Sequence, residues 1–296
     1  MTGVEFHAFE TGAVAAKALA VALGVGFHPI ALHRFPDGET LPRVAATRPH
    51  TVLAHVPLDH PNEKLIVLLL AADAWRRQGV ARLVLVAPYL CYMRQDTVFH
   101  PGEPLSRDVV CGLIGRSFDR VVTVDTHLHR TASLSAAFGG LPADDLSAAG
   151  PLAAALGGHD QPLIVGPDSE SKPWVTRIAA QLGGEVLMFE KTREGDHAVT
   201  LCAKDLGRVQ GRRVVIVDDI CSSGGTLIQA IRHLRGAGAA VIDIGVVHAL
   251  FPAAIEARLR EAGAARIIST DSVCHPTNAA PLAALLADAL KDECPP

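Results

Sequence analysis

The chain has 296 residues, of which 49% are apolar and 20% are charged, and its formal net charge is −4. This composition excludes global disorder, and the lack of a basic excess excludes a protein whose main partner is a nucleic acid backbone. The length suits two domains of about 150 residues each.

Cysteine spacing and hydropathy bound the environment of the protein. No C-x-x-C pair occurs, so neither a zinc site nor a disulfide framework is predicted and a reducing compartment fits best. No apolar run reaches about 18 residues, and no basic stretch leads into a long apolar run near the N-terminus. We therefore expect a cytoplasmic protein with no membrane partner.

Short apolar runs alternate with helical patterns along the chain. Runs rich in β-branched residues, without polar alternation, are typical of strands covered on both faces, and they lie at residues 51–56, 83–87, 121–125, 163–166, 214–218 and 241–247. Apolar spacings of three and four predict helices at residues 13–23, 63–78, 106–118, 175–182, 226–236 and 253–262. Repeated strand, helix and strand predict an α/β fold with mainly parallel sheets flanked by helices.

A Gly-, Ala- and Pro-rich stretch at residues 138–161 interrupts this alternation. We place a domain boundary there, which gives domains at residues 1–145 and 146–278. The halves have a similar length and rhythm, which suggests two related α/β domains. Residues 279–296 contain one more amphipathic helix, which we expect to pack on the first domain.

The motif at residues 213–226 indicates phosphate chemistry. An apolar strand ends in Asp218 and Asp219 and is followed by a small, glycine-rich turn, with a helix predicted from about Leu227. Small residues let backbone N–H groups approach an anion, and the helix N-terminus adds partial positive charge. We therefore expect the turn to hold a phosphate while the two carboxylates face the hydroxyls of the attached sugar.

This segment resembles the phosphoribosyl-diphosphate loop that phosphoribosyltransferases share with ribose-phosphate diphosphokinases. Further stretches at residues 34–40, 87–106, 121–127, 163–168 and 189–193 resemble the diphosphokinase family, in the same order and over nearly the whole chain. The resemblance implies two phosphoribosyltransferase-like domains. It implies that the first is the ATP side and that the second binds ribose 5-phosphate.

The ribose 5-phosphate site is expected at the strand ends of the second domain. The resemblance implies that its residues are Asp168, Asp218, Asp219, Ser222, Ser223, Gly224, Gly225 and Thr226. Two positions depart from the family pattern. Residues 169–171 replace a glycine pair, which suggests a narrower or more acidic pocket, and Ser222 replaces an aspartate without preventing phosphate binding.

The ATP site is expected in the first domain. The resemblance implies that its residues are Phe35, Asp37, Glu39, Arg94, Gln95, Asp96 and His127. In the family, the loop that matches residues 34–40 reaches across a subunit interface to grip adenine. We therefore expect a homo-oligomer, either a dimer or a multiple of dimers.

Two basic residues and a metal complete the expected site. Lys191 and Arg193 are two positions apart, so both project from one side of an extended segment, and they resemble the basic pair of the family's catalytic flap. The family's magnesium (Mg2+) implies a role for His127 and Asp168 at the metal.

The sequence therefore predicts a magnesium-dependent enzyme that moves the diphosphoryl group of ATP to C1 of ribose 5-phosphate and releases AMP. Two alternatives remain at this point. A phosphoribosyltransferase would consume the same product, but it has no use for the stretches around Phe35, Arg94 and His127. A regulatory homologue that assembles with an active enzyme is suggested by the departures at residues 169–171 and 222, although the basic pair is present.

Overall fold

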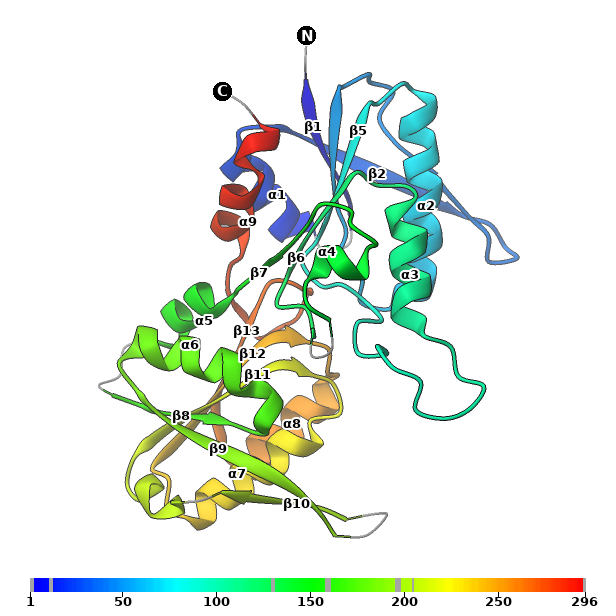
Figure 1. Cartoon of the computed structure of the whole chain (residues 1–296). Coiled ribbons are helices and arrows are strands. Elements are labelled where there is room, and N and C mark those ends of the chain that lie inside the picture. Colours follow the sequence, from blue (N-terminus) through cyan, green and yellow to red (C-terminus); the bar gives the residue numbers. More distant parts are fainter. Residues whose placement is uncertain are drawn as a thin grey trace. The chain divides into compact units, whose positions relative to one another are not determined.

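The computed structural model describes residues 3–10, 13–128, 131–157, 161–194, 198–203 and 205–294, with only the backbone described for residues 191–203. The chain divides into two compact units. Unit 1 comprises Met1–Ser147 and Leu282–Pro296, and unit 2 comprises Ala148–Pro281. Figure 1 shows a sheet flanked by helices in each unit.

Unit 1 is built on a seven-stranded sheet with the order β3-β2-β1-β4-β5-β6-β7. Only the pairing of β2 with β3 is antiparallel. The strands are β1 (Val4–Phe9), β2 (Gly26–Arg34), β3 (Thr40–Arg43), β4 (Thr51–His55), β5 (Arg82–Ala87), β6 (Arg120–Val124) and β7 (Ala143–Leu146).

The helices of unit 1 cover the two faces of this sheet. They are α1 (Ala13–Leu23), α2 (Pro61–Arg77), α3 (Ser106–Gly115), α4 (Leu134–Ala137), α9 (Ala283–Leu290) and the short η3 (Lys291–Glu293). The crossover from β1 to β2 runs in the opposite direction to those from β4 to β6, so right-handed connections place α1 and α2 on opposite faces. Trp75 and Leu68 of α2 are fully buried in the core on the α2 face.

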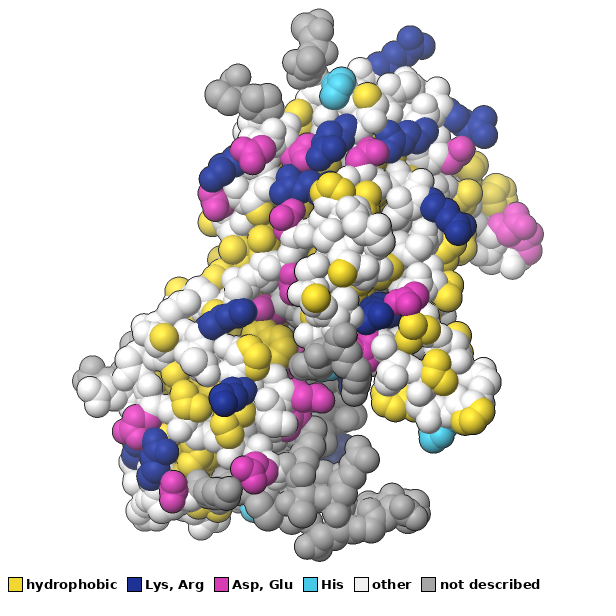
Figure 2. Space-filling view, viewed as in Figure 1, with side chains coloured by type: hydrophobic (Ala, Val, Ile, Leu, Met, Phe, Trp, Pro, Cys, Tyr) yellow, Lys and Arg dark blue, Asp and Glu magenta, His cyan; other side chains and the backbone are white. Residues whose placement is uncertain are grey.

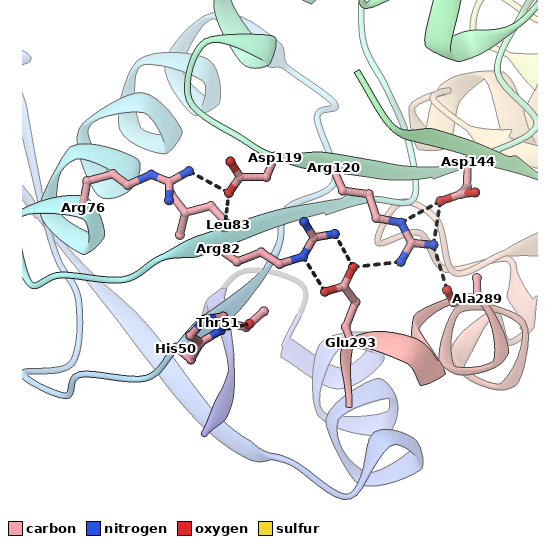
Figure 3. A network of polar contacts seen from close by, with 10 residues as sticks. All are labelled: His50, Thr51, Arg76, Arg82, Leu83, Asp119, Arg120, Asp144, Ala289 and Glu293. Atoms are coloured by element: carbon pink, nitrogen blue, oxygen red, sulfur yellow. Dashed lines mark hydrogen bonds and ion pairs between the residues drawn. The ribbon is translucent and has the colours of Figure 1, made fainter. Parts of the chain in front are cut away.

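The C-terminal helix belongs to unit 1, where α9 packs against α1. In η3, which follows α9, Glu293 accepts hydrogen bonds from Nε and Nη2 of Arg82, at 2.7 and 2.6 Å, and from Nη1 of Arg120 at 3.0 Å. Arg120 also donates to the carbonyl of Ala289 and to Asp144 (Figure 3). These contacts tie the end of the chain to the starts of β5 and β6.

Unit 2 has a second seven-stranded sheet, with the order β10-β9-β8-β11-β12-β13-β14. Its strands are β8 (Leu163–Gly166), β9 (Glu185–Glu194), β10 (Ala198–Ala203), β11 (Arg213–Cys221), β12 (Val241–Ala249), β13 (Ala264–Thr270) and β14 (Asn278–Ala280). Its helices are α5 (Ala149–Leu156), η1 (Ser169–Ser171), α6 (Lys172–Leu182), η2 (Leu206–Val209), α7 (Gly225–Gly236) and α8 (Ala253–Ala262).

The two sheets share one topology. In both, the first strand of the unit lies third in the sheet, the next two strands form an antiparallel edge, and the remaining four follow in parallel on the other side. The predicted α/β fold with two mainly parallel, helix-flanked sheets is confirmed. β11 is longer than the predicted run at residues 214–218, because its pairing with β12 continues as far as Cys221 and Ala249.

Candidate functional site

The predicted phosphate turn lies between the end of β11 and the start of α7. Gly224 precedes the helix in the left-handed conformation, with φ of 69°, and no side chain caps the helix. A Cβ atom at this position would lie 2.6 Å from Cγ2 of Ile255, so only glycine fits between α7 and α8. The helix thus starts at Gly225, before the predicted Leu227, with backbone N–H groups in the orientation that binds anions.

Residues beyond the motif hold this turn from behind. The N–H of Leu250 donates to the carbonyl of Cys221 at 2.8 Å, which fixes the last residue of β11. Phe251 is held in turn by His275, whose Nε2 lies 2.9 Å from the carbonyl oxygen of Phe251. Local sequence patterns do not indicate a role for these residues, because hydrogen bonds between segments that are distant in sequence leave no local pattern.

Three carboxylates gather beside the turn. Asp168 follows β8, which pairs with β11, and both Asp168 and Asp219 are buried. Burial raises the pKa of Asp218 well above its ordinary value, and the negative charges of Asp219 and Asp168 raise it further. The carboxyl edge of this sheet therefore accumulates negative charge that sugar hydroxyls or a cation would relieve.

The segment that replaces the family's glycine pair forms a short helix. Oδ1 of Asp168 accepts from the N–H groups of Glu170 and Ser171, at 3.0 and 3.2 Å. The hydroxyl of Ser171 donates to the carbonyl of Asp168 at 2.6 Å. Asp168 is therefore the N-cap of η1, which holds its carboxylate at the end of β8.

In unit 1, the predicted ATP residues follow two adjacent strands. Arg94, Gln95 and Asp96 lie in the loop after β5, where Arg94 and Gln95 are exposed. His127 follows β6, which pairs with β5, and is half-buried. The structure thus places these four residues at the same edge of one sheet.

The Phe35 segment lies elsewhere in the same unit. It forms the turn of the β2–β3 hairpin, in which the N–H of Phe35 donates to the carbonyl of Glu39 at 2.8 Å and Asp37 accepts from the N–H of Glu39 at 3.1 Å. Phe35 is 40% exposed. Two strands, β1 and β4, separate β2 from β5, so the fold sets the hairpin apart from the loop that carries Arg94.

The predicted catalytic pair lies on another edge hairpin. Lys191 and Arg193 belong to β9 and pair with Leu201 and Val199 of β10 in an antiparallel ladder. The segment is therefore extended. The prediction required this, because residues two positions apart share a side only in an extended segment. Their side chains lie outside the part of the chain that the structure describes.

The described residues contain neither an enclosed metal cage nor a membrane-spanning helix. Among them, no group of three or more His, Cys, Asp or Glu side chains forms a ready-made cage for a metal ion. In the same part of the chain, no helix has the length and apolar character needed to cross a bilayer. Acidic and basic side chains are interspersed on the face drawn in Figure 2.

Comparisons with known proteins find relatives of both units. Residues 7–117 match the N-terminal domain of ribose phosphate pyrophosphokinase, and residues 152–271 match the phosphoribosyl transferase domain. A ribose-phosphate pyrophosphokinase from Methanopyrus kandleri is 33% identical over 290 residues, which cover 96% of this chain and 98% of that protein. A ribose-phosphate pyrophosphokinase from Methanosarcina mazei is 32% identical over 273 residues, which cover 91% of this chain and 90% of that protein.

A solved structure resembles the whole chain. The phosphoribosylpyrophosphate synthetase from Mycobacterium smegmatis is 26% identical, covers 97% of both chains and has a TM-score of 0.83. The likeness therefore extends through both units, whereas the phosphoribosyl transferase model matches unit 2 alone.

Proposed function

The chain belongs to the ribose-phosphate pyrophosphokinase family, and we propose which of its residues carry out the family reaction, the transfer of the diphosphoryl group of ATP to C1 of ribose 5-phosphate. The reaction gives 5-phosphoribosyl 1-diphosphate and AMP. Such a transfer depends on alignment and charge neutralisation more than on covalent catalysis.

Unit 2 is proposed to bind ribose 5-phosphate. The N–H groups and hydroxyls of the turn hold the 5-phosphate, and the residues concerned are Ser222, Ser223, Gly224, Gly225 and Thr226. Asp218 and Asp219 accept hydrogen bonds from the ribose hydroxyls, and Asp168 lies beside them at the end of β8. The left-handed Gly224 before an uncapped helix is the observation that supports this assignment most directly.

Unit 1 is proposed to bind ATP. Arg94, Gln95 and Asp96 hold the nucleotide, and His127 lies at its phosphates. The guanidinium of Arg94 is exposed and is suited to contact either a phosphate or an aromatic base. Phe35 stacks on adenine, while Asp37 and Glu39 accept from its amino group.

The basic pair is proposed to act on the transferred group. Lys191 and Arg193 close over the β-phosphoryl group of ATP and stabilise the charge that develops there as the C1 hydroxyl attacks. A well-placed donor of this kind is typically worth about 3 to 4 kcal/mol. The extended backbone of the β9–β10 hairpin supports this proposal, because residues two apart in a strand share a face.

A divalent cation, Mg2+, is proposed as the cofactor. Carboxylate oxygens suit this ion, and the raised pKa of Asp218 marks a place where positive charge is favourable. The ion would neutralise the phosphates of ATP, with His127 and Asp168 as its nearest protein groups, directly or through water. Because no described cluster encloses a metal, ATP itself supplies most of the ligands in this proposal.

The functional unit is proposed to be a homo-oligomer, a dimer or a multiple of dimers. The position of the Phe35 hairpin, two strands away from the β5 edge, supports an adenine contact made to a neighbouring subunit.

Product analysis tests the function. The purified protein is mixed with ATP, Mg2+ and ribose 5-phosphate, and the products are identified by mass spectrometry. Formation of 5-phosphoribosyl 1-diphosphate and AMP is expected. In a second sample that contains 5-phosphoribosyl 1-diphosphate and a nitrogenous base instead, release of diphosphate would identify a phosphoribosyltransferase. No turnover in either sample without a second protein would identify a regulatory homologue.

A further inference from the structure

The shared topology of the two units assigns equivalent positions to their loops. β1 and β4 of unit 1 occupy the places that β8 and β11 occupy in unit 2. Between each of these pairs the strand order reverses, and open α/β sheets bind ligands at the carboxyl ends of strands at such a switch point. In unit 2 this position is the proposed ribose 5-phosphate site, and in unit 1 it is the connection from β4 to α2.

A cavity of 710 Å³ lies at this position in unit 1. It is lined by the ends of β1 and β4 and by the start of α2, and its apolar wall consists of Phe9, Leu32, Val56, Pro57, Pro61 and Val67. The residue before α2, His60, is left-handed with φ of 47°, as Gly224 is before α7. A cavity of this size accommodates a small organic molecule.

His55, the last residue of β4, lines the cavity and is 3% exposed. Its imidazole makes no hydrogen bond to the side chain or backbone of another residue in the described part of the chain. Burial lowers the pKa of His55 to about 4, although a hydrogen bond of the ring to its own backbone raises it, so the ring is neutral at physiological pH and has one nitrogen left for a ligand. A buried polar group of this kind favours a ligand that hydrogen-bonds to it.

The acidic and basic side chains at the mouth of the cavity form ion pairs with one another. Lys64 donates to Asp59 at 2.5 Å and to the carbonyl of Pro57 at 2.9 Å, and Arg34 donates to Glu63 at 3.0 Å. Pro61 has no N–H group, and Glu63 already supplies negative charge to the first turn of α2. The cavity therefore lacks the anion-binding character of the turn at Gly224 and favours an uncharged ligand.

We propose that this cavity is a second ligand site, which binds an uncharged heteroaromatic compound of nucleoside size. The apolar wall packs on the faces of the ring, and His55 hydrogen-bonds to its edge. The topological part of the argument rests on the proposed ribose 5-phosphate site, whereas the cavity and His55 are observed independently of it.

Direct binding of adenosine, inosine and cytidine to the whole protein tests the proposal, by saturation-transfer NMR first without ATP and then with saturating ATP. At least one nucleoside is expected to bind with a dissociation constant of about 1 mM or lower. His55→Phe, which removes the polar contact, and Leu32→Trp, which narrows the cavity, are each expected to weaken binding about tenfold. His50→Phe is the matched control, because His50 is an exposed histidine immediately before the start of β4.

Three results would overturn the proposal. They are the absence of binding by all three nucleosides, displacement of the bound nucleoside by ATP, and loss of binding in Arg94→Ala with retention in His55→Phe. Ribose 5-phosphate turnover is measured on the same samples. An active enzyme that binds no nucleoside contradicts the second site alone, whereas an inactive protein that binds one contradicts the proposed function alone.

Discussion

Asp168 follows the end of β8 and Asp218 lies in the last half of the neighbouring strand β11, and the negative charge of Asp168 contributes to the raised pKa of Asp218. A carboxyl whose pKa is higher in the folded than in the unfolded state stabilises the fold below its unfolded pKa. That stability is lost as the pH rises through the folded pKa. At neutral pH, where the unfolded carboxyl is ionised, Asp218 therefore destabilises the unliganded protein.

We predict that Asp218→Asn raises the free energy of unfolding at pH 7 and weakens ribose 5-phosphate binding. The variant removes a carboxyl whose ionisation the folded site opposes, and this carboxyl is one of those proposed to accept a hydrogen bond from a sugar hydroxyl. Urea unfolding from pH 3 to pH 8 measures the first effect. The advantage of the variant should disappear near the ordinary pKa of 3.8, and an advantage that is constant with pH would refute this explanation.

Glu293 provides a second pH-dependent test, in unit 1. Its hydrogen bonds from Arg82 lower its pKa most, and those from Arg120 lower it further. We predict that Glu293→Gln lowers the free energy of unfolding by about 1.5 to 3 kcal/mol at pH 7, because charged hydrogen bonds are lost. A carboxyl with a lowered pKa stabilises the fold above its unfolded value of 4.5 and ceases to do so as the pH falls through the folded pKa.

The difference between wild type and Glu293→Gln should therefore shrink as the pH falls below 4.5. Chemical denaturation followed by circular dichroism measures it. Asp288→Asn is the matched control, because the ion pair of Asp288 with Lys291 is exposed and contributes little. Equal losses in the two variants would mean that the contacts of Glu293 do not anchor α9 and η3.

Local sequence patterns predicted six of the inner strands and the glycine-rich turn after β11, but missed the edge strands and several inner strands, among them β1 and β13. The run at residues 163–166 is uniformly apolar and buried, which identifies it as a central strand. β2 is an edge-side strand with mostly exposed or half-buried residues, so its sequence lacks the apolar run on which the prediction depended. The Pro-Asp-Gly sequence at residues 36–38 favours a turn, but it does not by itself reveal the strands on either side.

The electrostatics of the site required the fold. The raised pKa of Asp218 depends on Asp168, which is 50 residues away in the sequence and becomes a neighbour only when β8 pairs with β11. The cavity beside His55 likewise depends on the ends of β1 and β4 and the start of α2. Motif spacing carries information on local turns, whereas sheet order determines which motifs meet.

Lys191→Ala is predicted to lower turnover by about two orders of magnitude or more, with a modest loss of ribose 5-phosphate affinity. The reason is that the proposed contact of Lys191 strengthens only as charge develops on the β-phosphoryl group. Steady-state kinetics with both substrates varied separate turnover from affinity. Lys291→Ala is the control, since Lys291 is an exposed lysine of unit 1 paired with Asp288, and unchanged turnover in Lys191→Ala would remove this residue from the mechanism.

The placement of the Phe35 hairpin gives a test of subunit cooperation. We predict that Phe35→Ala and Arg94→Ala each raise the KM for ATP by about tenfold or more, because each removes one side of the proposed adenine contact. If the hairpin serves a neighbouring subunit, mixed dimers contain one site with both substitutions and one intact site. A 1:1 mixture then has wild-type ATP affinity in about a quarter of its sites.

The mixture is prepared by joint refolding or co-expression, and ATP dependence is measured on the mixed sample and on each variant alone. Recovery of a high-affinity fraction in the mixture is expected, whereas a simple average of the two variants would show that each hairpin serves its own subunit. The double variant Phe35→Ala/Arg94→Ala mixed with wild type is the matched control, because its hybrid dimers contain two damaged sites and no additional intact one. If two variants with weakened ATP binding regain high affinity when mixed, contacts must be exchanged between chains, which a monomeric enzyme cannot provide.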